Sequence, residues 1–206
     1  MLIMSELPSI DRWCAWTPSD VYKRIGRVDR PWHVAGGWAL DLWLRRQTRQ
    51  HGDLEISVLR SDFSVFREAI GPLSFFAAKN GVLTPLEVDE CPAPDVHQVW
   101  VLDPVERCWK LDLFLDPGDD LWWTYRRDPS VQVSRRECVA LSQNGIPFLA
   151  PEIVMLYKAK RLAAKDRDDF DVCAPFLEPA ARHWLSRMIE KYFPSHEWQD
   201  RLRSTE

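Results

Sequence analysis

The 206-residue sequence lacks three features that would place the protein in a special class. It has no apolar run close to the roughly 20 residues that a membrane span needs. Its first residues do not combine a basic region with a long apolar stretch, as a secretion signal does. It has no excess of positive charge, since the formal net charge is -4. These absences argue against a membrane protein and a nucleic-acid-binding surface, and we expect a soluble, cytoplasmic protein.

Cysteine and histidine patterns typical of zinc fingers are also missing. The cysteines are scattered over the chain, at Cys14, Cys91, Cys108, Cys138 and Cys173. None of them forms a CxxC pair, so the sequence predicts free thiols in a reducing cytosol. Four histidines have no partner at ligand spacing and are expected to lie outside any site: His33, His97, His183 and His196.

Periodicity and turn residues predict an α+β fold, with a mixed sheet flanked by helices. Strands are expected over 31–35 and 53–58, and in two hairpins, 99–102 with 109–115 and 139–142 with 146–149. Helices are expected over 17–28, 38–46, 61–69, 150–164, 166–174 and 179–192. We therefore predict a mixed α/β domain over 1–150 and a small helical domain over 151–206.

The most informative segment runs from Val34 to Ile56. Gly36 and Gly37 stand where a strand meets a helix, which allows close approach of a ligand to the backbone. The free N–H groups and the positive dipole end of the following helix attract phosphate. A glycine pair alone is weak evidence, because many tight turns use one.

Two acidic residues follow this helix on the next strand. Asp53 and Glu55 are two apart, so their side chains project from the same face. Two neighbouring carboxylates repel each other, and a divalent cation would relieve that repulsion. Mg²⁺ fits best, since it prefers oxygen ligands and substrate phosphates. Taken alone, the acidic pair would more often be an ordinary solvent-facing strand edge.

The order and spacing of these residues resemble a known family. The chain reads Gly-Gly-Trp-Ala-Leu-Asp-Leu-Trp-Leu over 36–44, Thr-Arg-Gln-His over 48–51 and Asp-Leu-Glu over 53–55. This is similar to the aminoglycoside 2″-adenylyltransferase family and to the nucleotidyltransferase fold shared with DNA polymerase β. Glu55 stands where close relatives have Asp, and residues 60–105 match no specific resistance enzyme.

The resemblance implies a set of site residues. Asp53, Glu55 and a third carboxylate would be catalytic and hold the metal, and Asp112 is preferred over Asp116 because it stands mid-strand with no turn to explain it. The nucleotide would be bound by residues near the glycines and on the helix after the sheet, namely Gly36, Gly37, Trp38, Arg49, His51 and Lys158. A solvated basic helix face explains Lys158 equally well, and a turn-stabilising role is the alternative for His51. Asp41 is expected to bind nearby backbone or Arg45 rather than metal.

The implied reaction is Mg²⁺-dependent transfer of AMP from ATP, or from another nucleoside triphosphate, to a hydroxyl of a small acceptor. The acidic segments at Asp89-Glu90, Asp95 and 116–120 could favour a cationic acceptor such as an aminoglycoside, or could be ordinary solvated surface. Trp122-Trp123, expected in a loop, is a candidate for stacking on substrate. Two alternatives stay open: a regulatory or toxin–antitoxin enzyme that modifies protein or RNA, and a non-catalytic nucleotide-binding module. The oligomeric state and the identity of the acceptor are not predicted.

Overall fold

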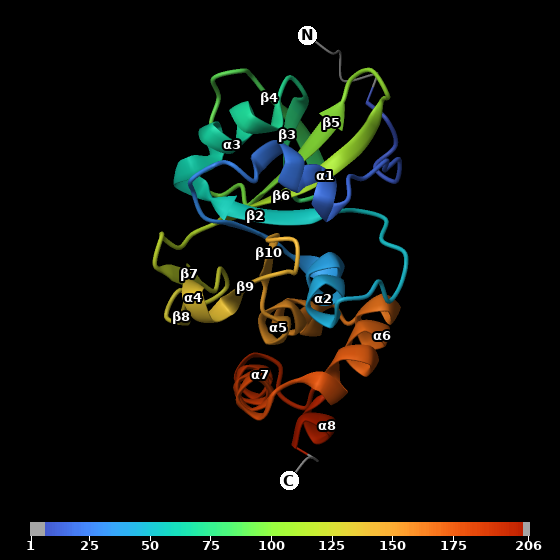
Figure 1. Cartoon of the computed structure of the whole chain (residues 1–206), viewed down its shortest axis with the longest axis vertical. Coiled ribbons are helices and arrows are strands. Elements are labelled where there is room, and N and C mark those ends of the chain that lie inside the picture. The colour runs from blue at the N-terminus through green and yellow to red at the C-terminus, as the bar shows by residue number, and fades with distance from the viewer. Residues whose placement is uncertain (1–6, 204–206) are drawn as a thin grey trace.

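The computed structural model describes residues 7–203, and its centre is an eight-stranded mixed sheet with the order β4-β3-β5-β6-β2-β1-β10-β9 (Figure 1). Only β2 with β6 and β1 with β10 pair in parallel within it. Its strands are β1 (Trp32–Val34), β2 (Glu55–Leu59), β3 (Ser74–Lys79), β4 (Val82–Leu86), β5 (Gln98–Asp103), β6 (Cys108–Asp116), β9 (Val139–Leu141) and β10 (Pro147–Leu149). A separate two-stranded sheet contains β7 (Trp122–Thr124) and β8 (Gln132–Ser134).

Helices precede, interrupt and follow the strands. They are α1 (Pro18–Ile25), α2 (Gly36–Leu44), α3 (Phe63–Ile70), α4 (Arg135–Cys138), α5 (Pro151–Arg161), α6 (Ala164–Cys173), α7 (Pro179–Tyr192) and α8 (Gln199–Arg203), with short 3₁₀ turns at Arg60–Asp62 and Ala174–Phe176. In Figure 1 β3, β4, β5, α1 and α3 lie in the upper part of the molecule, β7 to β10 lie at mid-height beside α2 and α5, and α7 and α8 form the lower end. The α+β class and the mixed sheet flanked by helices are confirmed.

Most predicted elements are present with small shifts at their ends. The first helix begins as expected because Thr17 and Asp20 form a reciprocal capping box, but it ends at Ile25. The helix after the glycines begins at Gly36 itself. Both predicted hairpins are present. The expectation of a loop at Trp122-Trp123 is wrong, because both residues lie in β7. The sequence did not predict β7, β8, α4 or α8.

The alternation within the central strands places apolar and polar side chains on opposite faces. Ile56 and Val58 of β2 are at most 1% exposed and belong to the main core. Leu111, Leu113 and Leu115 of β6 are equally buried, which leaves the other face of both strands for polar groups. This polar face is the foundation of the candidate site.

The helical segment begins where the sheet ends, since β10 stops at Leu149 and α5 starts at Pro151. Helix α5 packs against α2 and α7, so it lies beside the helix that follows the glycine pair. The division into domains 1–150 and 151–206 stays a prediction. No helix within residues 7–203 is long and apolar enough to cross a membrane. The N-terminal stretch 1–6, for which a secretion signal was not expected, lies outside the described residues.

Candidate active site

A cavity of about 330 Å³ opens on the polar face of the central strands. It is bordered by β1, β2, the end of β6, the start of α2 and one side of α5. Six of the nine predicted site residues line it: Gly36, Gly37, Arg49, Asp53, Glu55 and Lys158. Residues that lie more than 100 positions apart in the sequence therefore share one pocket.

The acidic residues are brought together by the parallel pairing of β2 and β6. Glu55 is the direct register partner of Asp112, and the N–H of Asp112 donates to the carbonyl of Leu54 at 2.8 Å. Asp53 stands just before β2, two residues ahead of Glu55. The amide of Gln98, on the neighbouring strand β5, donates to Oδ2 of Asp112 at 2.6 Å. Gln98 is thus a site residue that the sequence did not indicate.

The electrostatics of this group reflect burial and neighbouring negative charge. Burial, together with the nearby Asp53, raises the pKa of Glu55 to about 7. Burial and the charge of Glu55 raise the pKa of Asp112 well above its usual range. Oδ1 of Asp112 is buried and has no hydrogen-bond partner. An unpartnered carboxylate oxygen and a cluster of oxygen donors are what a hard divalent cation requires, so the residues present fit Mg²⁺.

The three carboxylates are neighbours without forming a tight cluster. Among the described residues, no choice of one carboxylate oxygen each from Asp53, Glu55 and Asp112 gives three atoms that all lie within 4.8 Å of one another. Instead, Glu55 directs Oε2 at Gly36, where a methyl group placed on that glycine would come within 1.5 Å of it. Gly36 also has a φ of +58°, which a side chain would strain. Gly36 is therefore required both by its backbone angle and by its contact with Glu55.

The start of α2 offers backbone donors to the same pocket. The helix has nine residues, and no side chain caps its N-terminus at Ala35. The N–H groups of a helix's first turn have no partner inside the helix, and the helix dipole adds positive potential there. Gly37 lies under Arg49 and His51, since an added methyl group would meet these side chains at 2.5 and 2.7 Å. This end of α2 can bind an anionic group.

Arg49 and Lys158 meet at a pair of buried aspartates on α6. Arg49 donates through Nε and Nη2 to both oxygens of Asp169, at 2.8 and 3.0 Å. Nζ of Lys158 lies 2.8 Å from Asp169 and 2.9 Å from Asp166. Burial alone would lower the pKa of Lys158, but the two aspartates raise it overall, so the lysine stays charged. The two cations are fixed in place at the edge of the pocket.

His51 and Trp38 lie behind the pocket wall. Nε2 of His51 is 2.5 Å from Oδ2 of Asp41, and the ring packs on Trp38 with centroids 4.5 Å apart. The other oxygen of Asp41 accepts from the backbone and hydroxyl of Thr48 at 3.1 and 2.6 Å. As expected, Asp41 binds nearby backbone, although its side-chain partners are Thr48 and His51 rather than Arg45. This arrangement fixes the segment that leads into Asp53.

Asp116 has a different environment from Asp112. Its Oδ1 accepts from the hydroxyl of Ser57 at 2.6 Å, and its Oδ2 lies 3.5 Å from Arg135 and 3.9 Å from His33. Burial lowers the pKa of His33 to about 4, so this imidazole is neutral. His33 and His97 both line the pocket, which corrects the expectation that they lie outside it. The sequence feature that indicates a place in the pocket is the position of His33 on the strand that leads to the glycine pair.

Aromatic and basic residues close the pocket opposite the carboxylates. Trp123 is 1% exposed and packs edge-on against Tyr157 of α5, whereas Trp122 is 45% exposed and is not part of the lining. The guanidinium of Arg127 lies 5.1 Å from the ring of Tyr157. Of the acidic segments considered for a cationic acceptor, Asp116 lines the pocket, whereas Asp89, Glu90 and Asp95 do not. Further basic lining comes from Arg126, Arg161 and Lys165.

Comparisons with known proteins give one family match and one similar solved structure. Residues 19–75 match the model of the aminoglycoside-2″-adenylyltransferase family, a segment that contains the glycine pair and the first two carboxylates. A search of curated proteins finds no match. The crystal structure of ANT(2″)-Ia in complex with adenylyl-2″-tobramycin is similar to this chain, with a TM-score of 0.51 and 12% identity. The similarity covers 84% of this chain and 95% of that one.

The fold is a nucleotidyltransferase fold. The likeness to ANT(2″)-Ia covers 84% of this chain and so extends beyond the family match over residues 19–75. The resemblance predicted from the sequence is thereby confirmed. Family match and fold together support a nucleotidyltransferase enzyme. Asp112 and Lys158 lie outside the matched segment, so their assignments depend on the pairing of Asp112 with Glu55 and on the place of Lys158 in the pocket lining.

Proposed function

We propose that this protein transfers a nucleoside monophosphate, AMP from ATP in the first instance, to a hydroxyl group of a small acceptor and releases pyrophosphate. One observation carries the proposal. The parallel pairing of β2 and β6 sets Asp112 beside Glu55, and Glu55 lines the same pocket as the uncapped N-terminus of α2, whereas Asp112 is buried just behind the lining. Acidic metal ligands and a backbone phosphate site, side by side, fit a nucleoside triphosphate with its metal.

The metal ligands in this proposal are Asp53, Glu55 and Asp112. Mg²⁺ bound there would neutralise charge on the triphosphate and on the phosphoryl group in transfer. The unpartnered oxygen of Asp112 supports this assignment, and burial together with the charge of Asp53 raises the pKa of Glu55, which is typical of acidic groups placed close together. The choice of Mg²⁺ follows from the all-oxygen donor set.

The chain itself binds and orients the reactants. The N–H groups of Gly37 and Trp38 hold the distal phosphates, and Arg49 and Lys158 add positive charge beside them. Asp112 accepts the proton of the acceptor hydroxyl. The hydroxyl oxygen then forms a bond to the α-phosphorus, while the bond to the bridging oxygen breaks and pyrophosphate leaves. Catalysis is mainly positioning and charge stabilisation.

The acceptor is the least constrained part of the proposal. An aminoglycoside is the first candidate, because ANT(2″)-Ia is seen with adenylyl-2″-tobramycin and Asp116 offers one acidic group in the pocket. A second class is favoured by a specific observation. Arg126, Arg127 and Arg161 line the pocket, and such groups suit the phosphates of an RNA end. The overall charge of -4 argues the other way.

The test is pyrophosphate release from each of the four common nucleoside triphosphates against a panel of aminoglycosides, lincosamides and RNA. We expect release with one acceptor class that depends on Mg²⁺ and is lost in Asp53→Asn. Asp89→Asn, an exposed acid outside the pocket, is the matched control and should keep full activity. Equal output from Asp53→Asn and the unmodified protein would refute the metal-site assignment. Mg²⁺-dependent ATP binding without release for any acceptor would favour a non-catalytic module.

A further inference from the structure

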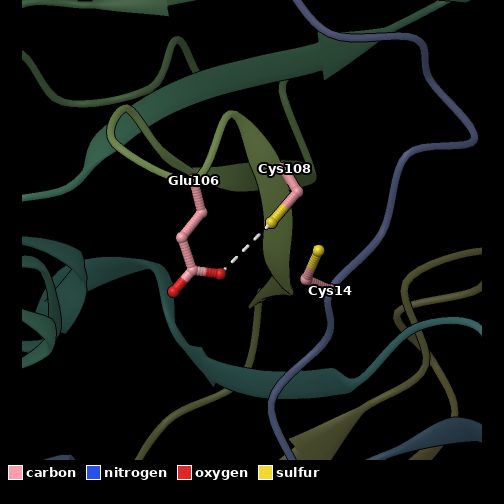
Figure 2. A group of neighbouring side chains, drawn as sticks. All are labelled: Cys14, Glu106 and Cys108. Atoms are coloured by element: carbon pink, nitrogen blue, oxygen red, sulfur yellow. Dashed lines mark hydrogen bonds between the residues drawn. The ribbon is translucent and has the colours of Figure 1, made fainter.

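A second cluster of metal-ligand side chains lies away from the candidate active site. The ligand atoms of Cys14, Glu106 and Cys108 all lie within 4.8 Å of one another. Figure 2 shows the two thiols facing each other, with the Glu106 carboxylate beside Cys108, at a distance of 3.7 Å. Cys108 is buried, whereas Cys14 and Glu106 are exposed, so an ion can reach the group from solvent. None of the three lines the active-site cavity.

Backbone pairing holds Cys14 beside Cys108. The segment around Trp13 forms a parallel bridge to Trp109, at the start of β6, where the shorter β2 does not reach. The N–H of Cys14 donates to the carbonyl of Trp109 at 3.0 Å, and the N–H of Trp109 donates to the carbonyl of Arg12 at 2.9 Å. The positions of the thiols are therefore set by the fold rather than by a flexible loop.

The third ligand atom is positioned by a capped turn. The carboxylate of Asp103 accepts from the N–H groups of Val105 and Glu106 at 2.8 and 3.0 Å. This turn joins β5 to β6 and places the Glu106 side chain over the first residue of β6. On the other face of the strand, the buried Trp109 packs edge-on against Phe76 and Trp100. The frame around the cluster is well packed.

Lys110 supplies the charge that such a site needs. Its ammonium pairs with Oε2 of Glu106 and is largely buried. Two thiolates and one carboxylate carry three negative charges, which a divalent cation and the ammonium together neutralise. Without a metal, two neutral thiols and the lysine–glutamate pair are also neutral. The cluster can therefore gain a divalent cation and release two protons without leaving an uncompensated charge.

We propose that Cys14, Cys108 and Glu106 form a binding site for a thiophilic divalent cation, with Zn²⁺ as the natural occupant. Two sulfur ligands select zinc over magnesium, and three protein ligands leave the fourth tetrahedral position for water. Bound metal would tie the 12–16 segment to β6, the strand that carries Asp112 at its fourth residue after Cys108. The proposal does not depend on the proposed function.

The experiment uses the full-length protein, reduced and freed of metal by a chelator. Titration with Co²⁺ should give a thiolate-to-cobalt charge-transfer band and the visible bands of a tetrahedral ion, both saturating at one equivalent. Zn²⁺ should displace the cobalt and raise the melting temperature. Cys14→Ser and Cys108→Ser should each lose the charge-transfer band, and Glu106→Gln should keep it with weaker binding. Cys91→Ser, an exposed free cysteine elsewhere, is the matched control and should behave like the unmodified protein.

Three results would overturn the proposal. The first is the absence of a charge-transfer band in the unmodified protein. The second is an unchanged band in Cys14→Ser, an exposed position that should tolerate serine even if Cys108→Ser does not fold. The third is a protein that, purified without reductant, holds no metal and carries a Cys14–Cys108 disulfide, which would make the pair a redox couple instead. Loss of pyrophosphate release in Asp53→Asn bears on none of these results, so the two proposals fail separately.

Discussion

The start and the middle of β6 present different ligand chemistry. Near its centre, Asp112 lies against Glu55 and offers only oxygen atoms, which suit Mg²⁺. At its start, Cys108 meets Cys14 and offers sulfur, which suits Zn²⁺. Four residues of strand, about 13 Å, separate the two. The oxygen ligands of one cluster favour Mg²⁺ and the sulfur ligands of the other favour Zn²⁺, so each cation would bind selectively to its own cluster.

The two clusters also differ in what compensates their charge. Lys110 pairs with Glu106 in the thiol cluster, so that cluster is balanced without a metal. Gln98 is the hydrogen-bond donor to Asp112, and an amide carries no positive charge. Without a metal, Asp112 in the carboxylate cluster therefore has a neutral hydrogen-bond donor, whereas Glu106 in the thiol cluster has a cationic partner. The predictions below test that contrast.

The largest effect should come from Asp112→Asn. An amide cannot accept the acceptor's proton, so we expect kcat to fall by about 10²–10⁴-fold while ATP binding is largely retained. The cobalt–thiolate band at the other end of the strand should be unchanged. Steady-state pyrophosphate assays and Co²⁺ titration measure the two readouts. If Asp116→Asn shows the loss of turnover and Asp112→Asn does not, Asp116 is the base.

Removing the aspartate between Arg49 and Lys158 should cost stability. Asp169 is 5% exposed and binds both cations, so Asp169→Asn removes the carboxylate that Arg49 binds and leaves Lys158 with Asp166 alone. Loss of one partner from a buried ion pair destabilises by about 3 kcal/mol. Urea unfolding measures the change. Asp171→Asn on the same helix is the control, since its exposed pair with Arg201 contributes under about 1 kcal/mol. Equal losses in both variants would contradict a structural role for the Arg49–Asp169–Lys158 group.

A smaller effect concerns pH and Glu55. Its pKa is about 7 in the folded protein against 4.5 in the unfolded chain, mainly because of burial. Well below pH 4.5 both states are protonated, so Glu55 does not change the free energy of unfolding. As pH rises to about 7, the unfolded chain ionises first and the folded state loses about 3 kcal/mol relative to Glu55→Gln.

Unfolding curves between pH 5 and 8 with a chelator present measure this difference. Mg²⁺ should reduce it, because the cation favours the ionised carboxylate. Glu68→Gln, an exposed acid on α3, should show no such pH dependence. If the difference in free energy of unfolding between Glu55→Gln and the unmodified protein stays constant over the pH range, the pKa of Glu55 is not raised in the folded protein.

Much of the site could be predicted from local patterns. The alternation in β2 and β6 and the glycine pair identify the polar face and the start of α2, because these features depend on neighbours within a few residues. The ends of the predicted helices and strands lie close to those in the structure, because they too depend on neighbouring residues. The elements between residues 118 and 138 cannot be predicted in this way, because β7, β8 and α4 are three or four residues long and show no periodicity.

The partners that act over long separations could not be predicted. Asp169 meets Arg49 across 120 residues, and the sequence shows only that α6 is acidic. Cys14 and Cys108 look scattered because their proximity depends on the pairing of residue 13 with residue 109. His33 has no histidine or cysteine at ligand spacing in the sequence, and its place in the pocket follows from β1 lying beside β2.

The most direct test of the central claim follows the phosphates of ATP. The protein is incubated with Mg²⁺ and the acceptor that gives pyrophosphate release, using ATP labelled at either the α- or the γ-phosphate. Nucleotidyl transfer predicts that the α-label appears on the acceptor and the γ-label in pyrophosphate. The γ-label on the acceptor, or its release as free phosphate without transfer of the α-label, would contradict the account.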